Sequence, residues 1–295
     1  MKIGMIGCGA MGAGIVKNLL KNHHQVWTFD PDPNKQDSMR ELGAIPVSSM
    51  ESVASTLEVI MLSLPLTELV EDAIVGEGGI LAHLEKGTYI LDMSTTDVNI
   101  TKKLAQYAKE AGVYFFDCPV SNGPVGAENG TLTIMVGGER EKFETIQPIL
   151  SVIGKEIRYI GPVGSGQVVK LCNNMVVAGI MVLLSETLVA GTKAGVDAKI
   201  IAEVMSIGSA QSKVLSVFGP NLINDTHENV NFLLSHMAKD VRLFTELAKD
   251  AQASIFVSPI VDQLFEIAKI QGKGSLDTSA VGQMLEVLSN HKIVN

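Results

Sequence analysis

The chain has 295 residues, of which 46% are hydrophobic and 19% charged, and its formal net charge is −9. This length favours two domains, and the composition is that of a globular protein. The acidic balance, with no basic stretch interleaved with aromatic residues, argues against nucleic acid and an anionic membrane surface as partners.

The three cysteines, Cys8, Cys118 and Cys172, lie far apart in the sequence. Their odd number argues for reduced thiols and against a disulfide framework, so we expect a cytoplasmic protein. The N-terminus runs directly into a strand-like segment, and we expect no signal peptide. The most apolar stretch, residues 175–190, is short for a bilayer and contains a serine and a glutamate, so we expect a buried helix. We also expect no metal site, since the sequence has no cluster of metal ligands and the adjacent His23 and His24 are expected on a turn.

Residues 1 to about 160 alternate short β-rich segments with amphipathic ones, which predicts a doubly wound, mainly parallel sheet. The expected strands are Lys2–Ile6, Gln25–Phe29, Val59–Leu62, Thr88–Asp92, Val113–Asp117, Leu132–Val136 and Ile157–Ile160. The expected helices include Ile15–Lys21, Ile100–Glu110 and Arg140–Leu150.

From about residue 165 helical patterns dominate, and the expected helices are Val168–Gly191, Ala198–Ser206, Val230–Ala251, Ser258–Gln271 and Ser279–Ser289. Turns are expected at Gly195, Gly208, Gly219-Pro220 and Gly272-Lys-Gly274. We therefore predict an α/β domain over residues 1–163. An all-α domain over residues 164–295 should follow, joined to it by one long helix.

The segment Gly7-Cys-Gly9-Ala10-Met11-Gly12 follows the first strand and opens a helix. Its glycines permit a tight turn and a close approach of the backbone to a pyrophosphate, whose charge the helix N-terminus favours. Asp30 ends the second strand at the distance expected for a residue that binds the ribose diol. With Pro31 where an NADP reader would place an arginine, the pattern favours NAD over NADP. A flavin, another nucleotide or a plain glycine turn is the alternative.

Lys170 and Asn174 lie one turn apart on the helix that begins after Gly161-Pro-Val-Gly-Ser-Gly166. An enzyme that moves a hydride from an alcohol to nicotinamide also needs a base for the hydroxyl proton. Lysine can serve where burial lowers its pKa towards the working pH. The alternative for an isolated lysine is a surface ion pair.

Four motifs in this order make the chain resemble the β-hydroxyacid dehydrogenase family over nearly its whole length. They are the glycine loop with Met11 before its last glycine, the stretch Asp117-Cys-Pro-Val-Ser121-Asn122-Gly123-Pro-Val-Gly, the Lys170/Asn174 helix, and Lys239-Asp240. The resemblance implies a Rossmann domain followed by a helical domain, and a nicotinamide cofactor.

The resemblance also implies roles for individual residues. Lys170 would be the general acid/base and Asn174 would fix the substrate, while Ser121 and the backbone of Asn122 and Gly123 would hold its carboxylate. Thr95 would line the nicotinamide pocket and Lys239 would reach the cofactor. Leu64 and Pro65 complete the expected cofactor contacts. For Asp240 we expect a role in orienting its helix, and for Ser94 the N-cap of the next helix.

One position departs from the family, which usually has two glycines after the serine of the substrate loop. Here the first is Asn122, and Pro124 follows Gly123. Either the asparagine side chain points away and only the turn changes, or it narrows the pocket or adds an amide there. The departure bears on the substrate and not on hydride transfer.

We therefore expect an NAD-dependent enzyme that interconverts a small, anionic 3-hydroxy acid and its semialdehyde, as 3-hydroxyisobutyrate dehydrogenases do. The alternatives within the family are reductases of tartronate semialdehyde (2-hydroxy-3-oxopropionate), succinic semialdehyde, glyoxylate or sulfolactaldehyde. A 6-phosphogluconate dehydrogenase would need a larger helical domain and a cationic cluster for its phosphate. A scaffold protein that has kept the fold would be expected to lose Lys170. The apolar residues of the helical half predict a homodimer or homotetramer.

Overall fold

The structure is a computed structural model that describes residues 1–294. The chain forms two compact units, one over Met1–Lys170 and the other from Leu171 onward. Helix α7 (Ser165–Lys193) belongs to both, so the chain passes from one unit to the next inside a helix. The expected domain boundary, after residue 163, precedes this helix.

The first unit is built on one sheet with strand order β3-β2-β1-β4-β5-β6-β8-β7, and β9 pairs with β8. The strands are β1 (Lys2–Ile6), β2 (Gln25–Phe29), β3 (Ile45–Pro46), β4 (Val59–Leu62), β5 (Tyr89–Asp92), β6 (Tyr114–Asp117), β7 (Val120–Ser121), β8 (Leu132–Gly137) and β9 (Gly154–Gly161). The strands from β3 to β6 are parallel, whereas β8 runs antiparallel to β6 and β7. The predicted doubly wound, mainly parallel sheet is confirmed.

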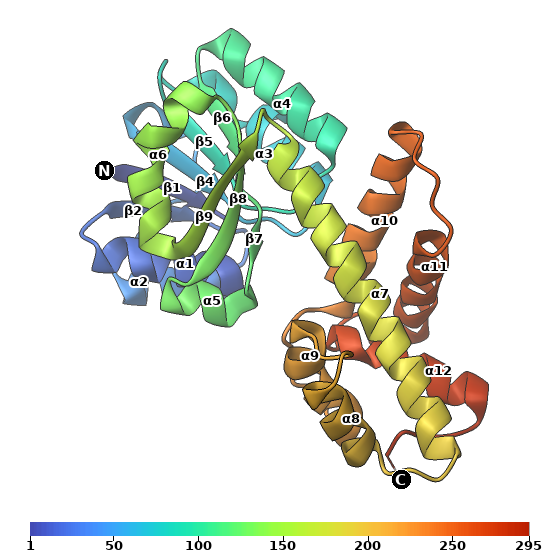
Figure 1. The fold of residues 1–295 in the computed structure, drawn as a ribbon. Coiled ribbons are helices and arrows are strands. Elements are labelled where there is room, and N and C mark those ends of the chain that lie inside the picture. Colours follow the sequence, from blue (N-terminus) through green and yellow to red (C-terminus); the bar gives the residue numbers. More distant parts are fainter. Residues whose placement is uncertain (295) are drawn as a thin grey trace. The chain divides into compact units, whose positions relative to one another are not determined.

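Helices cover both faces of this sheet (Figure 1). The helices of this unit are α1 (Ala10–Lys21), α2 (Pro33–Leu42), α3 (Thr67–Val75), α4 (Val98–Ala111), α5 (Gly123–Asn129) and α6 (Arg140–Ile153). One apolar core joins the sheet to α1 and α6, and another joins it to α3 and α4. Because the strands from β3 to β6 are parallel, their carboxyl ends all lie at one edge of the sheet, where a doubly wound fold binds its ligand.

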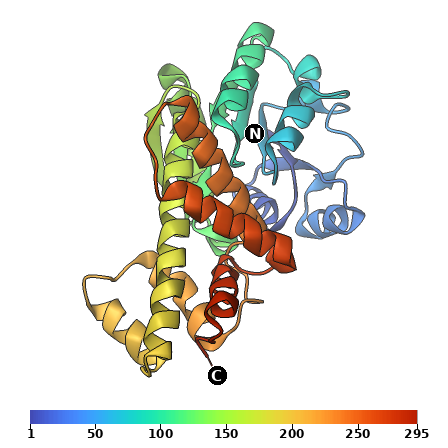
Figure 2. The ribbon, with the colours of Figure 1, turned by 90° about the vertical axis from the view of Figure 1, so that its right-hand side faces the viewer.

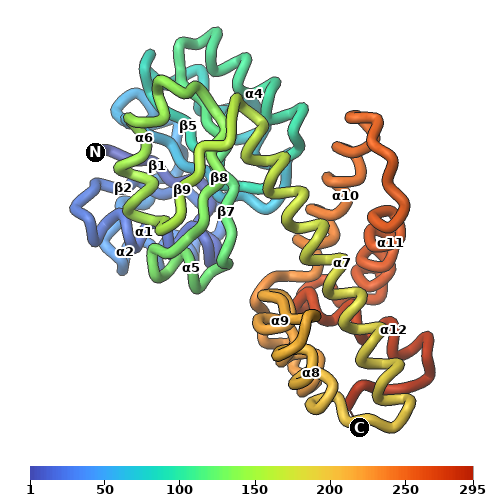
Figure 3. Tube along the Cα trace, in the orientation of Figure 1, coloured from blue at the N-terminus to red at the C-terminus, as the bar shows by residue number. Residues whose placement is uncertain are grey.

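The second unit is helical and consists of the rest of α7 with α8 (Ala198–Ile207), α9 (Lys213–Asn224), α10 (Leu234–Asp250), α11 (Ser258–Ala268) and α12 (Val281–Ser289). Figure 2 shows α7, in yellow, as one unbroken helix, and Figure 3 follows the chain through the shorter helices after it. Buried residues such as Met181, Leu188, Met237 and Phe265 form its apolar core.

Helix α7 is long and apolar enough to cross a bilayer by length and composition alone, and 44% of its most apolar window is buried. The core helix of a globular domain passes the same test. Because Ala178, Met181 and Leu188 are fully buried in the core of the second unit, we describe α7 as a core helix.

The expected turn at Gly219-Pro220 is wrong, since both residues lie inside α9. Proline removes one backbone hydrogen bond and disfavours a helix interior by about 3 kcal/mol. Here Leu215 and Leu222, on either side of the proline, are buried in the core. Their burial offsets this cost, which a local pattern does not reveal.

Candidate active site

The glycine loop follows β1 and leads directly into α1. Gly7 has φ +91°, in the left-handed region, and its N–H donates to the Phe29 carbonyl at 2.9 Å. Gly9 is the N-cap of α1 and makes no side-chain cap bond, and a Cβ at Gly9 would meet nothing within 4 Å. The first amides of a helix lack partners within it and carry a partial positive charge. The open space beside Gly9 therefore fits the pyrophosphate of a dinucleotide.

Asp30 lies at the end of β2 beside this loop and is largely buried. Its Oδ2 accepts the Cys8 N–H at 2.8 Å, and its Oδ1 accepts the Asp32 N–H at 3.0 Å. Two backbone donors thus fix the carboxylate, which retains lone pairs for further donors such as a ribose diol.

A cavity of about 400 Å³ opens beside Asp30. Two basic residues near Asp30 were not predicted, and only one of them, Arg40, lines this cavity. Lys35 Nζ lies 3.5 Å from Asp30 Oδ1, and Arg40, which pairs with Asp37, lines the cavity. Both cations come from α2, the helix after Pro31, and not from the position directly after Asp30. The expectation concerned only the position directly after Asp30, whereas the signal present in the sequence was the pair of basic residues within residues 33–42.

The loop between β5 and α4 carries Thr95 and is held by hydrogen bonds on both sides. Ser94 Oγ accepts the Leu64 N–H at 2.9 Å, which ties this loop to the Leu64-Pro65 segment after β4. The expectation that Ser94 caps α4 is wrong, because the N-cap is Asp97, which accepts the Ile100 N–H at 2.8 Å. Ser94 lies too far before the helix start at Val98 to cap it, and its hydroxyl instead bridges two loops.

Asp92 ends β5 and is fully buried under this loop. Its carboxylate accepts the Ser94 N–H at 2.9 Å and the Thr96 hydroxyl at 2.8 Å. Burial raises the pKa of Asp92 to about 6, although the hydrogen bonds from Ser94 and Thr96 favour the charged form. The residue therefore shapes the loop around Thr95 at an electrostatic cost.

Asp117 occupies the corresponding position on the next strand, β6, and caps α7. Its Oδ1 accepts the Gly164 N–H at 2.8 Å and its Oδ2 accepts the Gln167 N–H at 2.9 Å. Burial raises the pKa of Asp117, and these backbone hydrogen bonds oppose the rise. A carboxylate at a helix N-terminus also interacts favourably with the helix dipole. The first turn of the helix that carries Lys170 is thus fixed to the sheet.

Gln167, in this first turn, is fully buried and reaches the loop around Thr95. Its Oε1 accepts the Thr96 N–H at 3.1 Å and its Nε2 donates to the Ser94 carbonyl at 2.9 Å. Lys170 follows three residues later and is 7% exposed. Residues three apart lie on the same side of a helix, so Lys170 lies on the same face of α7 as Gln167.

The expected substrate loop begins on β7, where Ser121 is the register partner of Thr133 on β8. Asn122 and Gly123 both have left-handed backbones, with φ +86° and +60°. The Asn122 side chain donates to the Thr131 carbonyl at 3.0 Å and lies 3.3 Å from Thr133 Oγ1. These two contacts tie the Asn122 side chain to the start of β8.

Asn174, Lys239 and Asp240 lie together in the second unit. Asp240 Oδ2 accepts the Asn174 Nδ2 proton at 2.6 Å, and Lys239 Nζ lies 3.1 Å from Asp240 Oδ1. Asn174 Oδ1 also accepts the Asn173 side chain at 2.9 Å. Both ends of the Asn174 amide are thus oriented, and Asp240, which is buried, links it to Lys239.

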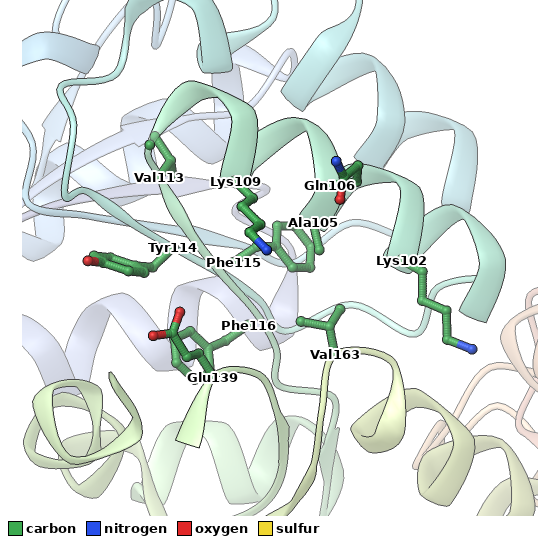
Figure 4. Close-up of a pocket in the computed structure, with 11 residues that line it drawn as sticks. Lys102, Ala105, Gln106, Lys109, Val113, Tyr114, Phe115, Phe116, Glu139 and Val163 are labelled. Carbon is green, nitrogen blue, oxygen red and sulfur yellow. The ribbon is translucent and has the colours of Figure 1, made fainter. Parts of the chain in front are cut away.

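A second hollow, of about 310 Å³, lies along α4 and is lined by none of the predicted site residues. Lys102, Lys109, Phe116, Glu139 and Val163 border it (Figure 4). Within residues 1–294, no three His, Cys, Asp or Glu side chains gather as metal ligands.

Residues 2–161 match the family described as the NAD binding domain of 6-phosphogluconate dehydrogenase. Residues 164–285 match the family described as NAD-binding of NADP-dependent 3-hydroxyisobutyrate dehydrogenase. The chain belongs to the β-hydroxyacid dehydrogenase family. It is therefore an oxidoreductase that uses a nicotinamide cofactor, as its glycine loop predicted.

Relatives match this β-hydroxyacid dehydrogenase over almost its full length. 2-(Hydroxymethyl)glutarate dehydrogenase of Eubacterium barkeri is 36% identical, covering 98% of this chain and 96% of that protein. 2-Hydroxy-3-oxopropionate reductase of Escherichia coli is 35% identical, covering 99% and 100%. The structure of Mycobacterium tuberculosis 3-hydroxyisobutyrate dehydrogenase with L-serine has a TM-score of 0.88 and 27% identity, covering 96% of this chain and 98% of that one.

The buried charge of Asp92 gives a testable pH dependence. An acid whose pKa is higher in the folded state than in the unfolded state destabilises the fold once it is ionised. For Asp92 the pKa is 3.8 in the unfolded state and about 6 in the folded state, so stability should fall as pH rises through this range. Asp92→Asn keeps the volume and removes the charge, so we expect it to raise the free energy of unfolding at pH 7.5 by up to about 3 kcal/mol. The gain should shrink at pH 4.5, as measured by urea unfolding.

Asp97→Asn is the control, because it removes a carboxylate from the same loop at a half-exposed N-cap. It should leave stability unchanged or slightly lower. An equal gain from Asp92→Asn at both pH values would contradict the assignment of this cost to charge burial.

Proposed function

We propose that this enzyme interconverts a small 3-hydroxy acid and its semialdehyde with NAD, and that Lys170 is the general acid/base. The observation that carries the proposal is the placement of Lys170. It is a buried lysine on a helix that Asp117 caps and that Gln167 joins to the loop around Thr95. An isolated surface ion pair would need none of this support.

Each part of the reaction has a candidate group in the chain. A nicotinamide cofactor held at the glycine loop would supply the hydride chemistry. Lys170 takes the hydroxyl proton in one direction and protonates the carbonyl oxygen in the other. Ser121 and the amides of Asn122 and Gly123 hold the substrate carboxylate with donors that add no charge. Asn174 orients the substrate, and Lys239 binds the cofactor together with Leu64, Pro65 and Thr95.

The names of several relatives point to one shared chemical unit. Three relatives, 36%, 33% and 31% identical to this chain, are named as dehydrogenases of 2-(hydroxymethyl)glutarate, L-serine and 3-hydroxyisobutyrate. All three compounds are HOCH2–CHR–COO⁻, where R is carboxyethyl, ammonium or methyl. Reduction of 2-hydroxy-3-oxopropionate, named for a relative 35% identical, gives the same unit with R as hydroxyl. We infer that this enzyme binds the hydroxymethyl and carboxylate groups by shared contacts, and that R distinguishes its substrate.

The cofactor proposal rests on Asp30. Its carboxylate is held by two backbone donors and would repel a 2′-phosphate. Lys35 and Arg40 oppose this preference, because both could pair with such a phosphate. We propose that NAD is preferred because Asp30 is buried and fixed, whereas both cations already pair with acidic side chains.

The second unit exposes apolar rows that favour a homo-oligomer. On α8, Val204 and Ile207 are 60% and 83% exposed, and Ile200 lies one turn before Val204. On α7, Val176 and Leu183 are also largely exposed and lie seven residues apart on one side. Contiguous exposed apolar surface marks interaction sites, and we propose that it joins copies of this chain as a dimer or tetramer.

Lys170→Ala should lower turnover about 10²- to 10⁴-fold, because the reaction loses its proton donor and acceptor. Binding of NADH, followed by its fluorescence, should persist. The assay is the change in reduced-nicotinamide absorbance with 3-hydroxyisobutyrate, L-serine, glycerate and 2-(hydroxymethyl)glutarate, and in reverse with methylmalonate, tartronate and succinate semialdehydes, glyoxylate and sulfolactaldehyde. Lys103→Ala, which removes an exposed ion pair with Glu71, is the control and should keep full turnover. Unchanged turnover in Lys170→Ala would exclude the proposed base.

Asp30→Ser should move cofactor preference towards NADPH. The change removes the repulsion of a 2′-phosphate and weakens the bond to the ribose, so the ratio of kcat/KM for NADH over NADPH should fall at least about tenfold. Lys35→Ala should lower kcat/KM for NADPH and spare NADH. A wild-type enzyme that uses NADPH better than NADH would contradict the proposal.

Light scattering at micromolar concentration should show a dimer or tetramer. Val204→Glu places a charge within the exposed row on α8 and should shift the species towards monomer, since an unpaired charge is costly to bury at an interface. The control Lys199→Glu changes charge on the same helix outside the apolar row. A monomeric wild-type protein would end the proposal.

A further inference from the structure

We propose that Gln167 is a positioning residue for catalysis, which sets the rotation of α7 and hence the place of the Lys170 amine against the loop around Thr95. The inference rests on the proposed role of Lys170 as acid/base. The juxtaposition that carries it is a single buried side chain bonded at both ends to the main chain of that loop.

Two different constraints act on the start of α7. Asp117 binds the Gly164 and Gln167 amides, which fixes where the helix begins. A cap at the helix end leaves rotation about the helix axis less well defined. The Gln167 side chain supplies this second constraint, because it projects sideways from the helix and contacts a separate element.

The chemistry of the Gln167 contact is specific to an amide. The Gln167 side-chain oxygen accepts the Thr96 N–H, and the side-chain nitrogen donates to the Ser94 carbonyl. One side chain thus provides hydrogen-bond partners for two main-chain groups. Glutamate could accept but not donate, and methionine could do neither. Thr95, between the two bonded residues, is thereby held in the same frame as the helix.

The position of Lys170 depends on that of Gln167, because both residues belong to the same helix. At about 100° per residue, a residue three positions on is offset by roughly 60° around the axis. Any rotation or shift of the first turn therefore moves Lys170 as well. A displacement of about 1 Å in a reacting group can cost about 10²-fold in rate.

A structural role alone would also require these bonds, since burying two unpaired main-chain groups destabilises the fold. A structural role and a positioning role predict different coupling between the effects of substitutions at Gln167 and Lys170. If Gln167 acts by placing Lys170, its removal should matter only while the lysine is present. A double-mutant cycle measures this dependence directly.

The experiment compares wild type, Gln167→Met, Lys170→Ala and the double variant in single-turnover hydride transfer with excess enzyme. We expect Gln167→Met to slow the step about 10- to 100-fold in the wild-type background and less than about threefold in the Lys170→Ala background. The primary isotope effect with deuterated NADH should rise in Gln167→Met. Gln167→Glu, which keeps size and one acceptor, provides the same comparison if the methionine variant does not fold.

Asn221→Leu is the matched control. Asn221 is another buried amide that binds the main chain, donating to the Asn229 carbonyl at 2.8 Å in the second unit. Its loss should lower the thermal midpoint and leave the hydride-transfer rate within about twofold. Equal slowing by Gln167→Met in both backgrounds would overturn the inference. Failure of Lys170→Ala to slow turnover would instead overturn the proposed function.

Discussion

The carboxylate of Asp117 imposes the constraint on which the start of α7, and with it the position of Lys170, depends. A buried carboxylate needs hydrogen-bond donors, and Asp117 finds them in the amides of Gly164 and Gln167 at the start of α7. The donors can approach because the residues around the carboxylate are small. A Cβ at Gly166 would lie 2.8 Å from Asp117 Oδ2, and Gly164 turns with φ +90°. The glycines at the start of α7 therefore leave the space and allow the backbone turn that the hydrogen bonds to Asp117 require.

Two buried acids lie side by side at the carboxyl ends of adjacent strands, since Asp92 and Asp117 are register partners. The two acids accept hydrogen bonds from different parts of the chain. Asp92 binds the loop that follows it in sequence, whereas Asp117 binds a helix almost fifty residues further along. Gln167 then joins the loop to the helix. One local and one distant hydrogen-bond set thus form a single polar network, in which each buried group has a partner.

Features that arise from local pattern were predictable, and features that arise from tertiary contact were not. The strand β1, the turn at Gly7 and the helix α1 follow from a short apolar run and the placement of glycines within Lys2–Lys21. The two-residue strand β7 is too short for any alternation to mark it. The roles of Asp117 and Gln167 depend on a contact fifty residues apart. Asp117 and Gln167 both lie within motifs singled out in the sequence, as neighbours of Ser121 and Lys170. Sequence spacing alone does not show that Asp117 and Gln167 contact each other.

Asn122 shows how a departure from a family pattern can leave the backbone of a turn intact. Asparagine is among the few residues other than glycine that tolerate a left-handed backbone, so the turn survives the replacement. Its amide then binds the Thr131 carbonyl, an anchor that glycine could not provide, and so reduces the conformational freedom of the loop. If this loop holds the substrate carboxylate, as proposed, a stiffer loop suits the unit shared by the substrates named for these relatives. On that proposal, the side chains that meet the variable group R, and not the loop that carries Ser121, distinguish one substrate from another.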